Sequence, residues 1–459
     1  MGESKKEEKV DVSKVKDIVN NLANTSKIFE GEFESITYYW GGDYEGKTYE
    51  VKDNKIVYTR VSENEIVGKL RWFLRTVLAR FVGSNLNSYE EVEECLYFLG
   101  TTSDQALKSD YEFRVKLISP GDKIRNVNLE DLDRVRIGMM GRDKSKEQLL
   151  PIDNVKFKLE VYKLKENNQV KNCVSSRDFL VVGGVLLTLA YIGIGKAANR
   201  GFGRFYPKNI EDKIAGLKEL KEKIIGGDVR GAFNHYYTTL GFDEKKGNDW
   251  RKSKIPLAPL TSVPIEKGGI YIYEQKVDEY KSMLCCNKVV LKSSWKIHWH
   301  GRIRDSGVKI HTWLFGLPRN VKGKTGYLAK GIDRRVSPIV LSPIKLPDNE
   351  YKIAVLPFLS SKDFKEELLD KGLEHVGTRR VKVVDLLDQN KIDKILRNSE
   401  KRAPPRDLKF VTGSVDSLIE NYLRELPNVL SEVCATASST QKRPPSQQSK
   451  GHRYRGQRF

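Results

Sequence analysis

Histidine, cysteine and long apolar runs are scarce in this 459-residue sequence. All six histidines follow residue 234, so the first half of the chain contains none. Metal-independent cleavage of a phosphodiester needs a general acid and a general base, and histidine most often supplies them. Tyrosine, lysine or arginine can substitute, so the lack of histidine weakens the case for such catalysis there and does not exclude it.

The five cysteines form no C-x-x-C pair, which argues against the common zinc modules and dithiol oxidoreductases. Their odd number predicts reduced thiols and a cytoplasmic location for Cys95, Cys173, Cys285, Cys286 and Cys434. Residues 179–192 form a nearly unbroken apolar run that is too short to cross a bilayer as a helix. The Lys/Glu-rich N-terminus does not resemble a signal peptide, so we expect a cytoplasmic protein with no membrane partner.

Basic residues are what the sequence has in excess. Lysine and arginine number 81 against 61 acidic residues, which gives a net charge of +20. A strongly basic balance favours a polyanionic partner, and nucleic acid is the first candidate. A Lys-rich surface of the kind found in thermophiles is the alternative interpretation.

Residues 193–205 concentrate glycines and cations in one short stretch. Glycine reaches positive φ and lets another backbone approach closely, and successive amides of such a loop form a concavity for anions. We predict a loop that binds a phosphate-rich ligand, and if that ligand is RNA, Phe202 or Tyr206 is placed to stack on a base. Its binding residues are predicted to be Gly193, Gly195, Lys196, Asn199, Arg200, Gly201, Phe202, Gly203 and Arg204.

Two familiar phosphate-binding motifs do not fit this loop. A P-loop needs Ser or Thr after the lysine, but Ala197 follows Lys196. The dinucleotide fingerprint must open a helix, whereas further glycines and Pro207 follow here. Instead, Ser175 or Ser176 caps a buried helix before the loop, and a strand follows at 202–206.

A second basic element is expected near the N-terminus. Ser62 and Glu65 have the spacing of a capping box, which predicts a helix from there to about Val82. Its apolar residues recur at helical spacing, and the cations Lys69, Arg71 and Arg75 fall largely off that face. These cations either contact RNA or form a solvated basic surface.

Three separated motifs resemble the RAMP superfamily, the RNA-binding subunits of type III CRISPR effector complexes. The loop follows the family pattern G-φ-G-x(4-5)-R-G-φ-G. Residues 66–75 resemble the first helix of the RAMP subunit that opens the Cmr operon of type III-B systems, with Val67 where Arg is usual. The motifs G-L-P at 316–318 and R-R-x-S-P at 334–338 match the same subunit. Arg334 and Arg335 therefore either contact RNA or form a salt bridge between domains.

The resemblance implies an α+β protein with two tandem ferredoxin-like (RRM-related) RAMP domains. The expected divisions are an N-terminal extension (1–28), a first domain with the glycine-rich loop (29–210), a second domain (211–433) and a disordered basic tail (434–459). The resemblance further implies a binding subunit with no cofactor that contacts the 3′ region of the guide RNA (crRNA) and the target RNA beside other RAMP subunits. It is not expected to be an enzyme.

The alternative function is a stand-alone RAMP-class endoribonuclease that processes repeat RNA. Its candidate catalysts are His235, His298, His300 and His311. Residues 293–300 alternate like a strand, which would present His298 and His300 on one face as possible zinc ligands. Because the spacing fits no familiar zinc module, we expect no metal there.

Overall fold

The computed structural model describes residues 26–42, 47–100, 107–125, 127, 129–132, 147–164, 171, 173–300, 311–316, 319–321, 325–329, 337–370, 372–376, 381–388, 390–391 and 412–437. The predicted N-terminal extension, apart from residues 26–28, and the tail beyond Ala437 lie outside the described residues.

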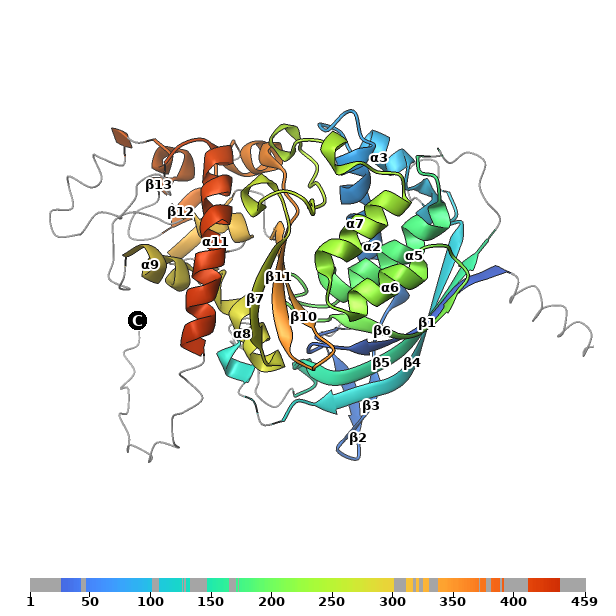
Figure 1. Cartoon of the computed structure of the whole chain (residues 1–459). Helices are drawn as coiled ribbons and strands as arrows, with labels where there is room; N and C mark the ends of the chain where they lie inside the picture. The colour runs from blue at the N-terminus through green and yellow to red at the C-terminus, as the bar shows by residue number, and fades with distance from the viewer. Residues whose placement is uncertain are drawn as a thin grey trace, which may run out of the picture.

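The first half of the chain forms a four-stranded antiparallel sheet with helices on one face (Figure 1). Its elements run β1 (Lys27–Ser35), α2 (Glu63–Phe81), β4 (Tyr111–Lys123), β5 (Ile152–Lys163), α5 (Arg177–Leu187) and β6 (Phe205–Asp212). The strand order is β4-β5-β1-β6, so the last strand lies beside the first. This is the β-α-β-β-α-β arrangement of a ferredoxin-like fold, and it confirms the predicted α+β, ferredoxin-like class.

Side-chain periodicity explains which face of this sheet the helices cover. Alternate residues of a strand point to opposite faces, and β1 buries Phe29 and Phe33 while its glutamates point the other way. α2 buries Leu70 and Leu74 at helical spacing, as its sequence predicts. α5 is buried on every side and begins at Ser176, whose hydroxyl accepts a hydrogen bond from the Phe179 amide.

A hairpin between β1 and α2 projects from the sheet (Figure 1). It consists of β2 (Tyr49–Lys52) and β3 (Lys55–Thr59). Its turn residues Asp53 and Asn54 have φ of 50° and 60°, the left-handed values that a tight hairpin turn requires. The Thr59 hydroxyl donates to the Pro120 carbonyl at 2.6 Å, which fixes the base of the hairpin to β4.

Two further helices, α6 (Leu217–Ile225) and α7 (Val229–Thr239), pack against α5. The Tyr236 hydroxyl of α7 donates to the Leu180 carbonyl at 2.8 Å. A Cβ on Gly183 would lie 2.9 Å from the Tyr236 ring, so the glycine allows α7 to approach α5 closely. The predicted boundary near residue 210 assigns this helix pair to the second domain, whereas its packing joins it to the first.

The second half repeats the beginning of the same arrangement. β7 (Tyr271–Val277), α8 (Glu279–Lys288), β10 (Ile339–Lys345) and β11 (Tyr351–Pro357) follow one another in strand, helix, strand, strand order. The sheet order β10-β11-β7 corresponds to β4-β5-β1 of the first sheet. Among the described residues no fourth strand joins this sheet, and α11 (Val415–Ala437) packs beside β7 (Figure 1).

The remaining elements are short. They are α3 (Glu90–Glu94), η1 (Tyr97–Leu99), η2 (Leu129–Asp131), η3 (Glu147–Leu149), η4 (Thr188–Ile192), η5 (Glu244–Lys246), η6 (Trp250–Lys252), η7 (Ile265–Lys267), α9 (Lys292–His300), η8 (Thr312–Phe315), β8 (Arg319–Val321), β9 (Thr325–Leu328), η9 (Asp363–Leu369), β12 (Glu374–Val376), β13 (Val381–Lys382) and η10 (Val383–Leu386). β13, β12, β9 and β8 form a small antiparallel sheet. In the part of the chain that the structure describes, no helix is long and apolar enough to cross a bilayer.

The strand predicted at residues 293–300 is wrong, because this segment is the helix α9. Trp295 is fully buried, and its ring centroid lies 5.4 Å from that of Phe315 and 4.8 Å from that of Tyr422. The aromatic pocket that receives it comes from η8 and α11, which are distant in sequence. Tertiary packing therefore overrides the local alternation of apolar and polar residues.

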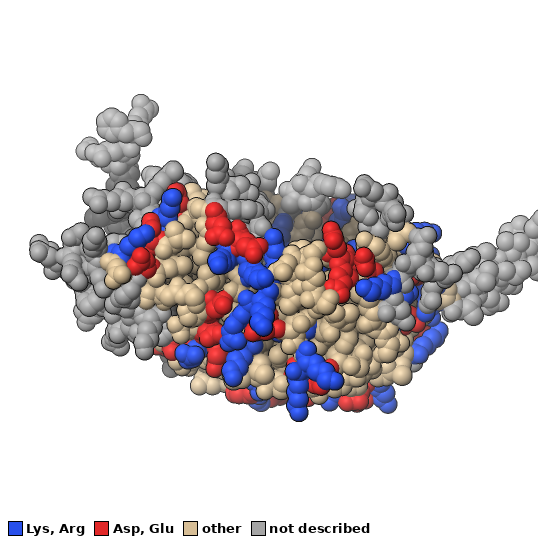
Figure 2. Space-filling view, turned by 90° about the horizontal axis from the view of Figure 1, so that it is seen from above, with Lys and Arg blue, Asp and Glu red and all other residues tan. Residues whose placement is uncertain are grey.

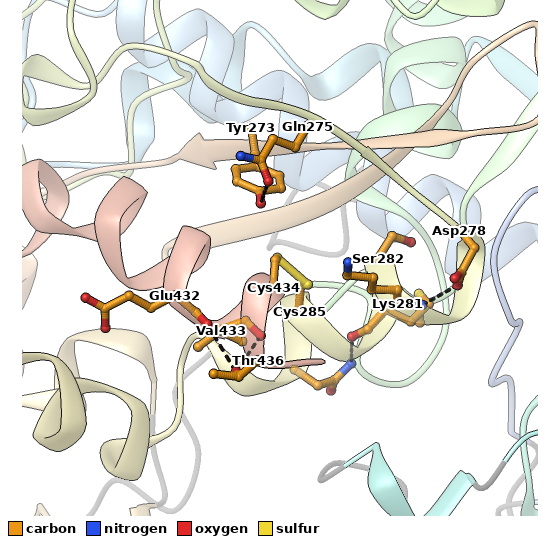
Figure 3. The surroundings of a disulfide bond; sticks show 12 residues. Tyr273, Gln275, Asp278, Lys281, Ser282, Cys285, Glu432, Val433, Cys434 and Thr436 are labelled. Carbon is orange, nitrogen blue, oxygen red and sulfur yellow. Dashed lines mark hydrogen bonds between the residues drawn. A yellow bond between two sulfur atoms is a disulfide. The ribbon is translucent and has the colours of Figure 1, made fainter. Parts of the chain in front are cut away.

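The predicted reduced state is wrong for four of the five cysteines. Cys95 is bonded to Cys173 and Cys285 to Cys434, while Cys286 is free and buried. The two pairs are 78 and 149 residues apart in sequence, so no local motif indicates them. The second disulfide links α8 to α11, close to Tyr273 and Gln275 of β7 (Figure 3).

Candidate nucleic-acid interface

The glycine-rich loop, residues 193–204, lies between the two halves of the molecule. α5 continues into the π-helical turn η4, which ends at Gly193, and β6 begins at Phe205. On one side the loop follows the end of β1, where the Gly203 amide donates to the Tyr38 carbonyl at 2.9 Å. On the other side it reaches β10, where the Leu341 amide donates to the Asn199 carbonyl at 3.2 Å.

The four loop glycines are required by contacts within the protein. Gly193 has φ of 78°, and a Cβ there would lie 1.9 Å from Arg204 Nη1. A Cβ on Gly203 would lie 1.9 Å from the Ile194 carbonyl oxygen, because the loop folds back on itself. The other two glycines, Gly195 and Gly201, also have positive φ. A Cβ at these two would meet the Trp40 carbonyl at 2.7 Å and the Pro343 ring at 2.9 Å.

Arg204 is fully buried and binds the second half of the chain. Its guanidinium donates from Nε to Ser342 Oγ at 2.9 Å and from Nη2 to the Leu341 carbonyl at 3.0 Å. The third bond runs from Nη1 to the Phe202 carbonyl at 2.7 Å. Burial lowers the pKa of Arg204 to about 9. The acceptors of these three hydrogen bonds are carbonyl and hydroxyl oxygens.

Arg200 and Phe202 are also fully buried. Arg200 donates from Nη2 to the Phe315 carbonyl at 2.9 Å. Phe202 packs in a small apolar cluster with Trp40 and Met283. None of these three side chains, Arg200, Phe202 and Arg204, is accessible in this structure to a strand outside, so their predicted contact with RNA stays a prediction.

The loop amides are largely occupied by acceptors within the protein. The Lys196 amide donates to the Trp40 carbonyl at 2.6 Å and the Ile194 amide to the Gly203 carbonyl at 3.0 Å. The Gly195 amide donates to the carboxylate of Glu65, one of the two residues of the predicted capping box. Ser62 begins α2 without a side-chain cap, so that capping box does not form. Glu65 therefore accepts a loop amide that the sequence predicted would bind a phosphate.

The partly exposed part of the loop is the stretch from Gly195 to Asn199, in which only Ala198 is buried. Lys196 and Asn199 are half-buried, and the Lys196 ammonium lies 5.9 Å from the centre of the Trp40 ring. Lys69 of α2 lies close by and is also half-buried. Burial lowers the pKa of Lys69, as does the nearby charge of Arg204, while Glu65 opposes the shift. Among the predicted cations that the structure describes, Lys196 and Lys69 remain the best placed for a phosphate.

Arg71 and Arg75 are both paired with one carboxylate. Arg71 Nη2 lies 3.0 Å from Glu93, and Arg75 forms a second ion pair with the same residue. The Arg75 guanidinium also lies 5.5 Å from the centre of the Tyr89 ring. These contacts favour a basic protein surface on α2 over RNA contact as the role of Arg71 and Arg75. Arg334 and Arg335 lie outside the described residues, so their predicted role stays a prediction.

The uncovered face of the first sheet carries paired charges. Glu34 of β1 lies 3.2 Å from Lys156 of β5 and 3.1 Å from Lys208 of β6. Glu30 is similarly paired with Lys158. The upper face in Figure 1, seen in Figure 2, also shows acidic and basic side chains interleaved. Neither surface has the uninterrupted basic character that a phosphate backbone favours.

A pocket of about 380 Å³, not anticipated from the sequence, lies between the base of the β2–β3 hairpin, the start of α2 and β4. Its lining includes Lys47, Tyr58, Arg60, Ser62 and Asn64. It adjoins the loop region through Tyr39, whose hydroxyl donates to the Arg60 carbonyl at 2.7 Å and to Glu65 at 3.3 Å. No sequence motif marks this pocket, because the residues of the hairpin and helix that form it follow no distinctive pattern.

The histidines whose side chains the structure describes lie on separate elements of the fold. His298 lies between Glu432, at 2.8 Å, and Glu425, at 3.2 Å. His311 is fully buried, and His235 contacts the Gly216 carbonyl at 2.8 Å. Within the described ranges, no group of three or more His, Cys, Asp or Glu side chains is arranged to hold a metal ion. His300 has no described side chain.

Comparison with known proteins supports the resemblance drawn from the motifs. Residues 32–206 match the family model of the RAMP superfamily, which confirms the resemblance for that segment. A search of curated proteins finds no match. Among solved structures, Cmr1 from Pyrococcus furiosus (apo form) is 11% identical with a TM-score of 0.43, covering 81% of this chain and 96% of that one.

Two chains from cryo-EM structures of a type III-B Cmr-β complex also match. One, from the complex bound to cognate target RNA, is 12% identical with a TM-score of 0.45, covering 81% of this chain and 98% of that chain. The other, from the complex with target RNA and AMPPnP in the presence of ssDNA, is 12% identical with a TM-score of 0.46 and covers 72% and 94%.

Proposed function

We propose that this chain, whose residues 32–206 match the RAMP superfamily, is a non-catalytic RNA-binding subunit of a type III-B CRISPR ribonucleoprotein. Its partners would be the 3′ region of the guide RNA, the target RNA and other RAMP subunits. The observation that carries the proposal is the family match, because the matched segment contains the end of β1, all of α2 and the glycine-rich loop together.

The charges of the chain are consistent with this proposal. The net charge of +20 supplies a general attraction to RNA. Lys196 and Asn199 on the exposed part of the loop, together with Lys69 of α2, supply local donors for phosphate oxygens. Because Arg200 and Arg204 are turned inward, the proposed contact is made by the outer part of the loop alone.

Substitution of Lys196 tests the proposed contact. Lys196→Ala should lower affinity for single-stranded RNA and reduce the slope of log K against log salt by about 0.7, the value for one phosphate of a single strand. Lys218→Ala removes the same charge from an exposed position on α6 and serves as the control. An equal loss of slope in both variants would show that only net charge matters and would remove the loop from the interface.

A binding role rather than an endonuclease role is proposed because residues 32–206, which match the family model, contain no histidine. Incubation of the purified chain with repeat RNA, with and without a chelator, separates the two functions. Retention of intact RNA supports the subunit, and specific cleavage supports the enzyme. Co-purification from the source cell, followed by sequencing of bound small RNA, would identify the RNA and the neighbouring subunits.

A further inference from the structure

The pocket at the base of the β2–β3 hairpin combines an aromatic ring, two cations and several polar groups. Tyr58 is 45% exposed and contributes a ring at the wall. Lys47 and Arg60 bring positive charge, while Ser62 and Asn64 bring neutral hydrogen-bonding groups. Glu50 and Glu63 also line the pocket, so it is not a simple anion site. A ligand that fits this set has an aromatic face, a polar edge and a negative group.

The pocket walls are held in place by the surrounding fold. The Thr48 amide donates to the Gln148 carbonyl at 2.7 Å, which fixes the first hairpin strand. The Thr59 hydroxyl bond to Pro120 fixes the second strand to β4. Glu63 accepts a hydrogen bond from the Val115 amide at 3.0 Å, which ties the start of α2 to the same strand. The cavity is therefore preformed, as ligand sites usually are.

The pocket lies beside the exposed part of the glycine-rich loop. Tyr39 bridges the two, since its hydroxyl contacts both the Arg60 carbonyl and Glu65, and Glu65 accepts the Gly195 amide. A pocket of about 380 Å³ is within the range of small-molecule sites.

We propose that this pocket binds one nucleotide, with its base stacked on Tyr58 and its phosphate near Lys47 and Arg60. Bases extruded from single strands commonly stack on aromatic side chains and present their edges to polar groups. The nucleotide is either a base turned out of the bound RNA strand or a free mononucleotide. Only the first possibility, a base turned out of the bound RNA strand, depends on the proposed function.

The test compares Tyr58→Ala, Tyr58→Phe and Val57→Ala in the full chain. Val57 is the matched control, because it is 49% exposed, adjacent in β3 and on the opposite face of the hairpin. The probes are a single-stranded RNA containing 2-aminopurine, followed by fluorescence and anisotropy, and AMP, followed by titration calorimetry. Loss of one stacked base should lower affinity roughly 5- to 150-fold and abolish 2-aminopurine quenching in Tyr58→Ala.

Tyr58→Phe keeps the ring and should retain most of the affinity, and Val57→Ala should bind within about twofold of the unsubstituted chain because it touches no ligand. If the unsubstituted chain binds RNA, Tyr58→Ala binds it equally well and AMP binding does not depend on Tyr58, the pocket inference fails while the proposed function stands. If AMP binds in a Tyr58-dependent way but RNA does not bind, the ligand is a free nucleotide and the proposed function fails. If neither probe binds, both fail.

Discussion

Arg204 and Lys196 belong to one loop but have opposite surroundings. Arg204 is fully buried and donates three hydrogen bonds, two of them to β10, whereas Lys196 is half-buried over the Trp40 ring. Their positions separate structural from binding roles within the loop. Substitution at each position should therefore change a different property.

Arg204→Met should lower the free energy of unfolding by about 3 kcal/mol or more. It leaves the Leu341 and Phe202 carbonyls and the Ser342 hydroxyl without their donor, and each unsatisfied buried group costs about 1–3 kcal/mol. Urea denaturation of both proteins measures the difference. At urea-free conditions the folded variant should bind RNA like the unsubstituted chain. A variant of unchanged stability with weakened RNA binding would contradict this assignment.

Two glycines offer a matched pair for testing backbone requirements. Gly193→Ala should destabilise the protein by more than about 2 kcal/mol, since it combines a strained φ with a steric clash against Arg204. Gly68 lies inside α2, and a methyl group added there would have nothing within 4 Å. Gly68→Ala should stabilise by about 0.5–1 kcal/mol through helix propensity. Thermal unfolding midpoints distinguish the two, and a shift in the same direction for both would contradict the packing explanation.

Sequence patterns could identify the loop but not the orientation of its side chains. The glycines correctly indicated positive φ and close approach, yet the approaching groups belong to the protein itself. Arg200 is bonded to Phe315 and Arg204 to Leu341, at separations of 115 and 137 residues. Burial of a guanidinium by carbonyls so distant in sequence leaves no local pattern. A buried and a phosphate-binding arginine look the same in a single sequence.

At the scale of elements, local periodicity accounts for the first sheet better than for the second half. β1, β4 and β5 alternate, and α5 is an apolar run with a serine cap, so each follows from its own residues. α9 does not, because its burial depends on partners in η8 and α11. The pocket beside the hairpin also depends on three elements meeting in space.

The two disulfides predict how many cysteines react with an alkylating reagent. Alkylation of the unfolded protein without reductant should modify one cysteine, Cys286, and alkylation after reduction should modify all five. Mass spectrometry counts the modified residues directly. Modification of five without reductant would restore the sequence-based expectation of free thiols.

Reduction should also lower stability by about 2–5 kcal/mol for each native bond that is lost, because the cross-links restrict the unfolded chain. The Cys285–Cys434 bond joins α11 to α8 and closes the longer segment. Cys434→Ser should therefore loosen α11 first, which hydrogen exchange of its amides would detect. Cys95→Ser should leave the exchange of α11 unchanged.

At the scale of the whole molecule, the contact between halves contains a buried carboxyl group. Burial, together with the charge of Asp153 in β5, raises the pKa of Glu279 at the start of α8 to about 8, although Lys345 of β10 opposes the shift. Asp278, Tyr38 and Tyr351 are the other titratable groups beside it. Between pH 4.5 and about 8 the folded protein holds a proton here that the unfolded chain releases.

Stability should accordingly fall as pH rises through that window and level off above it. Glu279→Gln carries no ionisable group, so it should flatten this decline and be more stable than the unsubstituted chain at pH 8 by at least about 1 kcal/mol. Denaturant titrations at several pH values measure the effect. Glu274→Gln, at an exposed position on β7, should keep the original profile. If stability still declines with rising pH in Glu279→Gln, other titrating groups cause the decline.

The inward side of the glycine-rich loop has a practical consequence for dissecting this protein. A cut between β6 and β7 would expose Arg200, Phe202 and Arg204 on one fragment and the bare carbonyls of β10 and η8 on the other. Neither fragment would then keep the surfaces that it has in the intact chain. Expressed separately, the two halves should fold poorly and aggregate. Mixing them should restore solubility only if the loop packs against β10 and η8 again.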